Sequence, residues 1–90
     1  MSKLVFESEF DELTREWNSQ QVKVGRHVYK FAIRGYFTPA GDPQFVPWVT
    51  VDFSSNRKVL TRVGNPTFAH AVEACEAFLE RWERQVRRFD

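Results

Sequence analysis

Hydrophobic and polar residues alternate along residues 29–37, which read YKFAIRGYF. One set of alternate positions is apolar: Tyr29, Phe31, Ile33 and Phe37. The other set is mainly basic and ends in an aromatic ring: Lys30, Arg34 and Tyr36. A period of two places successive side chains on opposite faces of a strand. The pattern therefore predicts a strand with one face toward a core and one basic face.

Two further strands are expected after this one. Residues 45–53, FVPWVTVDF, alternate in the same way, with Val49, Val51 and Phe53 on the core face. Pro47 cannot donate to a ladder, so this strand begins near it or lies at an edge. Residues 58–63, KVLTRV, are the third strand, and their pattern leaves the inward face open. We favour three antiparallel strands in meander order.

A long C-terminal helix is the clearest element. Apolar residues recur at helical spacing from Phe68 to Phe89, and Cys75 lies in the middle of this stripe. Asn65 suits the N-cap and Pro66 the first helical position, where a missing N–H costs nothing. The sequence therefore predicts one amphipathic helix that begins just after Asn65.

A second helix is predicted over residues 8–18, SEFDELTREWN. Ser8 can cap its first turn. Phe10, Leu13 and Trp17 are spaced i, i+3 and i+7, which gives one apolar stripe. The preceding residues KLVF form either a short strand or a packing arm.

The expected fold is a single α+β domain over residues 1–90, with its elements in the order α-β-β-β-α. Both helices would pack on one face of a three-stranded antiparallel sheet, leaving the other face open. This order resembles the double-stranded RNA-binding domain, and the resemblance rests on element order alone. That family contacts phosphates through a lysine cluster at the start of its last helix, where this chain has NPTFAHA with only His70. It also uses a histidine between the first two strands, where this chain has TPAGDPQ. None of the family's functional residues is therefore carried over.

The open face carries the first candidate site. Its basic and aromatic members are Lys30, Arg34, Tyr36, Trp48 and, from the third strand, Arg62 or Lys58. Basic groups can meet phosphates or acidic side chains, while aromatic rings can stack on bases. The alternative is that the charges keep the strands soluble and unpaired, with Trp48 tucked under the 38–44 loop.

Two other surfaces are candidates. Arg81, Arg84 and Arg88 form one stripe that could hold phosphates or an acidic partner, or could simply be a solvated helix end. Aromatic residues flank the proline-containing loop and could form a protein-binding patch or close a homodimer: Tyr36, Phe37, Phe45 and Trp48. The alternative is that Phe37 and Phe45 pack the base of the loop.

Composition and charge narrow the function. The net charge is only +1, but residues 21–62 carry seven bases against two acids. His27 and His70 have no metal-ligand spacing with Cys75, and we expect no enzyme, metal or cofactor. The chain has no apolar run long enough for a signal peptide or a membrane span, so a cytoplasmic location without membrane partners is expected.

The sequence therefore predicts a small non-enzymatic binding module that acts on a protein or nucleoprotein partner. Compact, cofactor-free proteins of this kind are common among phage and mobile-element inhibitors of host machinery, including anti-CRISPR proteins. The alternative function is direct binding of single-stranded nucleic acid through the same open face.

Overall fold

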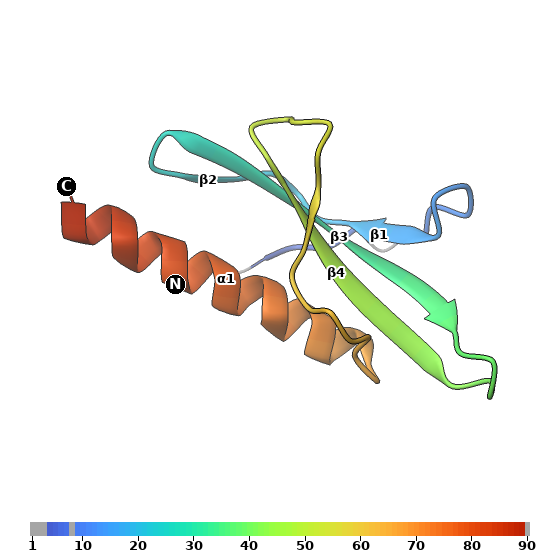
Figure 1. Ribbon diagram of the computed structural model, residues 1–90. Coiled ribbons are helices and arrows are strands. Elements are labelled where there is room, and N and C mark those ends of the chain that lie inside the picture. The colour runs from blue at the N-terminus through green and yellow to red at the C-terminus, as the bar shows by residue number, and fades with distance from the viewer. Residues whose placement is uncertain (1–3, 8, 90) are drawn as a thin grey trace.

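The computed structural model describes residues 4–7 and 9–89, which form an antiparallel sheet with one long helix across a face (Figure 1). The elements are β1 (Glu16–Asn18), β2 (Val22–Val24), β3 (His27–Phe37), β4 (Pro43–Val51), β5 (Lys58–Val59) and α1 (Phe68–Phe89). The expected α+β class and antiparallel sheet are confirmed. The expected order α-β-β-β-α is wrong, because five strands precede a single helix in the described residues. The resemblance to the double-stranded RNA-binding domain rested on that order and falls with it.

The N-terminal helix is replaced by a turn and a strand. The Asp11 carboxylate accepts the N–H groups of Leu13 and Thr14, which closes a local turn instead of a helix. Arg15 then takes a positive φ of 58°, and the chain enters β1. Leu13, expected on the apolar stripe, is 97% exposed. Ser8, the expected cap, lies outside the described residues.

β1 and β2 lie end to end along one edge of β3. Asn18 pairs with Ala32 and Val22 with Tyr29, so the edge carries one more residue than β3 over this stretch, as in a β-bulge. Ser19 lies at this point, and its buried Oγ accepts the N–H of Phe31 at 2.8 Å. The segment before β1 packs beside it, since Phe6 forms a bridge with Ser19.

β3 and β4 form the central hairpin. Its register pairs Tyr29 with Val51 at one end and Phe37 with Pro43 at the other. The N–H of Phe45 faces away from β3, toward Asn65. Pro47, two residues later, faces the same way, so its missing N–H falls on the side that β3 does not use.

One face of this hairpin holds the core under α1. The buried apolar residues on the sheet and the helix include Tyr29, Phe31, Ile33, Val49, Ala71, Cys75 and Leu79. The core face expected for β3 is confirmed in Tyr29, Phe31 and Ile33. Phe53 was expected there and is wrong: it lies beyond β4, has a positive φ of 59° and is 68% exposed.

The helix begins two residues later than expected, at Phe68. The Oγ1 of Thr67 accepts the N–H of His70 at 3.1 Å, which makes Thr67 the N-cap. Asn65, the expected cap, instead pairs with Phe45 and donates from its side chain to the Phe45 carbonyl. Among the described residues, no helix is long and apolar enough to cross a membrane.

Candidate binding site on the open face

A cavity of about 360 Å³ lies on the sheet face opposite α1, toward the tip of the β3–β4 hairpin. We call it the basic-aromatic hollow, and it is lined by Arg15, Arg34, Gly35, Tyr36, Val46 and Trp48. Arg34 pairs with Val46 in the ladder, and Ala32 pairs with Trp48 two steps along. Directly paired residues and those two steps along point to the same face. The alternation of the two strands therefore brings Arg34, Tyr36 and Trp48 together, as the sequence indicated.

The hollow carries two unpaired cations. Arg34 is exposed on β3, and Arg15 is exposed in the turn before β1. Neither guanidinium forms an ion pair with another residue in the described part of the chain. Glu16 lies opposite Arg34 in the ladder, but its carboxylate pairs with Arg57. Two arginines in one cavity without a direct ion pair favour an anionic group.

The tryptophan of the hollow is held from the loop that follows β4. The guanidinium of Arg57 lies 4.9 Å from the Trp48 ring centroid, a cation–π contact. The same guanidinium bonds the Glu16 carboxylate at 2.8 and 3.0 Å, and Glu16 is only 5% exposed. The expectation that Trp48 lies under the 38–44 loop is thus wrong, since the cover comes from Arg57. The Trp48 indole N–H is buried and finds no acceptor among the described residues.

Tyr36 is held by the loop between β5 and α1. A Cβ added to Gly64 would lie 2.9 Å from the Tyr36 hydroxyl oxygen and 2.9 Å from Gln44 Cβ. Only a residue without a side chain fits at this distance, so Gly64 packs directly against both side chains. Tyr36 is therefore a positioned ring with part of its surface exposed.

The other predicted site residues lie apart from the hollow. Lys30 shares the open face but pairs with Thr50, two steps beyond the Ala32–Trp48 pair and farther from the hollow. Lys58 pairs with Val49, a core-face residue, and so does not belong to the open face. Arg62 was expected on a third strand, but β5 ends at Val59 and Arg62 lies in the following loop.

The arginine stripe lies on a different element. Arg81 and Arg84 are exposed on α1, which packs on the opposite face of the sheet. The side chain of Arg88 lies outside what the structure describes. The structure therefore does not join this stripe to the basic-aromatic hollow.

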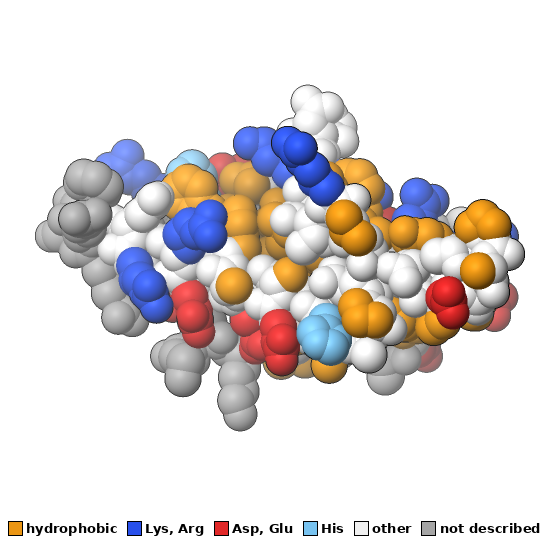
Figure 2. Space-filling view, turned by 60° about the horizontal axis from the view of Figure 1, so that its bottom comes forward, with side chains coloured by type: hydrophobic (Ala, Val, Ile, Leu, Met, Phe, Trp, Pro, Cys, Tyr) orange, Lys and Arg blue, Asp and Glu red, His pale blue; other side chains and the backbone are white. Residues whose placement is uncertain are grey.

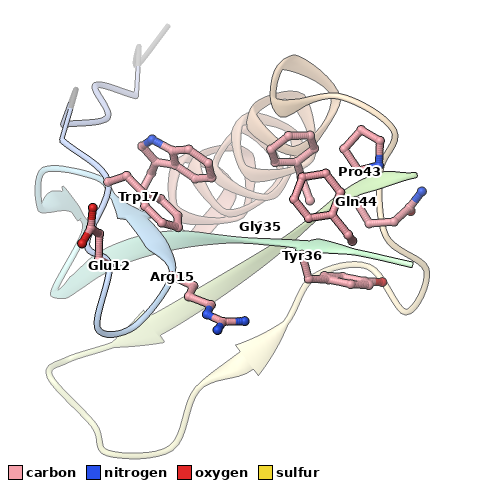
Figure 3. Close-up of a pocket in the computed structure, with 10 residues that line it drawn as sticks. Glu12, Arg15, Trp17, Gly35, Tyr36, Pro43 and Gln44 are labelled. Atoms are coloured by element: carbon pink, nitrogen blue, oxygen red, sulfur yellow. The ribbon is translucent and has the colours of Figure 1, made fainter. Parts of the chain in front are cut away.

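A second cavity, of about 350 Å³, adjoins the hollow across Gly35 (Figure 3). We call it the aromatic pocket, and it is lined by Phe10, Glu12, Arg15, Trp17, Gly35, Tyr36, Phe37, Pro43, Gln44 and Phe45. Figure 3 shows Trp17 and Glu12 on one side of Gly35, and Pro43, Gln44 and Tyr36 on the other. Arg15, Gly35 and Tyr36 line both cavities. Figure 2 shows exposed hydrophobic side chains at this hairpin end of the molecule.

The aromatic residues expected around the proline-containing loop are divided between the two cavities. Phe37 and Phe45 line the aromatic pocket, Trp48 lines the hollow, and Tyr36 lines both. Phe37 is 75% exposed, so it does not pack the base of the loop, whereas half-buried Phe45 contacts Trp17 and Phe68. Packing at the base of the loop therefore fits Phe45 but not Phe37, and a binding or dimer-closing role of these aromatic residues stays a prediction.

Sequence reasoning missed Arg15 and the rings of Phe10 and Trp17. All three were assigned to a helix that does not form. The available signal was the polar, apolar, polar order of Glu16, Trp17 and Asn18, followed by the small residue Ser19, which the structure buries. This order suits a short strand as well as a helix end.

His27 and Cys75 line neither of the two cavities. His27 Nδ1 lies 2.6 Å from Asp52 Oδ2, on an exposed surface at the far end of β3. Burial raises the pKa of the Cys75 thiol to about 12 and keeps it protonated. The residues that the structure describes contain no group of three His, Cys, Asp or Glu side chains placed to hold a metal ion.

Comparison with known proteins adds no assignment. No protein-family model matches the chain, no curated protein sequence matches it, and no solved structure matches its fold.

Proposed function

We propose that the chain is a binding module whose basic-aromatic hollow holds an acidic group of a macromolecular partner. The observation that carries this proposal is the position of Arg15 and Arg34 beside Tyr36 and Trp48 in one cavity. Arginine, tyrosine and tryptophan are the residues that contribute most at interface hot spots. The partner is a protein or a nucleoprotein complex.

The rigidity of the site supports the same proposal. Gly64 packs against Tyr36, and Arg57 fixes the face of Trp48 through Glu16. Side chains held before binding lose less conformational entropy when a partner arrives. The fold therefore already meets part of the ordering cost at Tyr36 and Trp48, whereas the exposed side chains of Arg15 and Arg34 lose freedom only when a partner binds.

Affinity capture from a lysate of the source organism tests the proposal. The wild-type chain and the Arg34→Glu variant serve as baits, with Arg26→Glu as the matched control. Arg26 is an exposed arginine in the turn at the opposite end of β3. We expect one or more partners that the wild type and R26E retain and R34E loses. Equal capture by all three baits would refute a role for the hollow.

A second candidate function is direct binding of single-stranded nucleic acid. It is favoured by the combination of two arginines and two aromatic rings on one sheet face. One face of Trp48 is covered by Arg57, so Tyr36 is the ring available for stacking. Fluorescence anisotropy with single- and double-stranded oligonucleotides at two salt concentrations tests it. Binding that weakens with salt and is lost in Tyr36→Ala would favour this function over the first.

The interpretation as a phage or mobile-element inhibitor, anti-CRISPR proteins included, stays a prediction from size and composition. The capture experiment bears on it directly, because a partner from host defence machinery would support it.

A further inference from the structure

We propose that the aromatic pocket and the adjoining edge of β3 bind an extended, acidic peptide segment that carries a bulky apolar side chain. This inference rests on the proposed function and specifies a partner that reaches both cavities, which share Arg15, Gly35 and Tyr36. Three independent features support it: the lining of the pocket, the free backbone of β3 and the unpaired charges.

The pocket suits one large apolar group. Six of its side chains are aromatic rings or proline from four separate segments: Phe10, Trp17, Tyr36, Phe37, Pro43 and Phe45. Its volume of about 350 Å³ is near the lower end of the range of about 300–1,000 Å³ for ligand sites. Phe10 and Trp17 are already in ring contact, at 4.4 Å between centroids, so an inserted ring would meet an existing aromatic wall.

The backbone of β3 is free beside this pocket. β1 begins at Glu16, opposite Arg34, and the N–H of Gly35 still reaches the Arg15 carbonyl at 3.1 Å. Backbone groups on a strand alternate between its two sides, so those of Phe37 point the same way as the N–H of Gly35. In the described part of the chain no strand pairs with Phe37 on that side. An extended peptide can add a strand there.

The charges select an acidic segment. Arg15 lines both cavities and Arg34 lines the hollow, and neither has a carboxylate partner among the described residues. Glu12 is the single acidic residue that lines the pocket itself. A peptide whose apolar side chain enters the pocket would place its neighbouring residues near these arginines. Acidic residues at those positions complement the two guanidinium groups.

A peptide fits these features better than a nucleic acid. The pocket is mainly apolar, so it offers few partners to a phosphate backbone. The short unpaired edge at Phe37 offers backbone hydrogen bonds, which a peptide can continue as a strand ladder and a nucleotide cannot.

The first test selects binders from displayed random peptides of about twelve residues, long enough to pair with one strand edge. The bait is the full chain, and each selected peptide is then measured by anisotropy. We expect selected sequences that combine an aromatic or large aliphatic residue with acidic neighbours. Their affinity should fall about tenfold in Phe37→Ala and in Arg15→Glu, the loss typical of an interface hot spot.

The controls match each variant in chemistry. Phe53→Ala removes an exposed phenylalanine at the other end of β4, and R26E reverses an exposed arginine at the other end of β3. Both controls should bind the peptides as the wild type does. Phe37 and Arg15 are themselves exposed, so their replacement leaves the core in place.

Backbone pairing has its own test. Two versions of a selected peptide are made, each with N-methyl groups on alternate residues. Each version lacks the N–H groups on one side of its extended backbone only. A peptide that pairs with β3 loses binding with one set of methyl groups and retains it with the other. Equal effects of both sets would overturn the strand pairing.

The outcomes separate this inference from the proposed function. If R34E loses its partner in capture but no acidic-aromatic peptide is selected, the proposed function stands and the inference falls. Binding of an oligonucleotide that depends on Phe37 would overturn the peptide as the occupant. A doubled mass in solution that Phe37→Ala returns to monomer would assign the pocket to a second copy of the chain, and would also overturn it.

Discussion

Trp17 lies against the backbone of Gly35 so closely that a methyl group on Gly35 would be 3.0 Å from Trp17 Cζ3. Gly35 belongs to β3 and Trp17 to β1, so this contact fixes where the edge strand ends against the central hairpin. It also places the indole beside the aromatic pocket and the Gly35 backbone between the two cavities.

The Gly35→Ala variant tests this contact. The added Cβ would also lie 3.4 Å from Trp17 Cη2, so the indole must shift. We expect the free energy of unfolding to fall by about 1–3 kcal/mol, as for other overpacked sites. Denaturant unfolding measures this change. The phenylalanine of Trp17→Phe lacks the clashing ring atoms. The double variant with G35A should therefore lose less stability than the sum of the two single losses. Strict additivity of the two changes would contradict the contact.

The Arg57→Ala variant tests the support of Trp48. It leaves the Glu16 carboxylate almost fully buried without its charged partner. We expect a loss of about 1–3 kcal/mol, because an unpaired buried charge costs more than the pair contributes. Adding Glu16→Gln removes that charge and should restore part of the stability. If R57A alone is neutral in thermal unfolding, the ion pair does not hold the loop.

Asp52 predicts how stability changes in acid. Hydrogen bonds from the Val28 N–H, at 2.9 Å, and from His27 hold the pKa of Asp52 below its usual 3.8. A carboxyl with a lowered folded pKa stabilises the fold above its unfolded value, and this contribution is lost as pH falls through the folded pKa. The wild type should therefore lose stability below about pH 4 more steeply than Asp52→Asn. An equally steep loss of stability in acid in the two proteins would contradict this role.

For Cys75 we predict slow reaction with thiol reagents and a loss of stability at alkaline pH. Its sulfur is fully buried, and burial raises its pKa to about 12 from a usual 9.0. A thiol reagent should label it only through unfolding, at a rate that rises with denaturant. Between pH 9 and 12 the unfolded thiol ionises and the folded one does not, so stability should fall there. Cys75→Ala should show a smaller fall, because burial also raises the pKa of Tyr29 and leaves its contribution in place. Rapid labelling of the native protein would contradict the burial.

The central hairpin and α1 could be predicted because each carries a long periodic pattern. Residues 29–37 alternate over a whole strand, and the helix repeats its apolar stripe over several turns. Patterns of this length outweigh local propensity, and the open-face positions of Arg34, Tyr36 and Trp48 followed from the same alternation.

The N-terminal part could not be predicted because its signals are short and fit two structures. Phe10 and Trp17 contact each other across a turn just as residues on one helix face would. Asp11, which lies within the predicted helix, forms a local turn with Leu13 and Thr14. The bulge at Ser19, which lets β1 and β2 share one edge of β3, depends on a tertiary contact with Phe31. Arg15 reaches the site only through this arrangement.

Site-specific photocrosslinking in living cells tests the central claim most directly. A photoreactive phenylalanine analogue replaces Tyr36 in the hollow, or Phe53 at the far end of β4 as the control position. We predict a discrete adduct from position 36 only, sensitive to protease, that disappears when Arg34→Glu is added. An adduct of equal yield from position 53, or one that persists with R34E, would contradict binding through the basic-aromatic hollow.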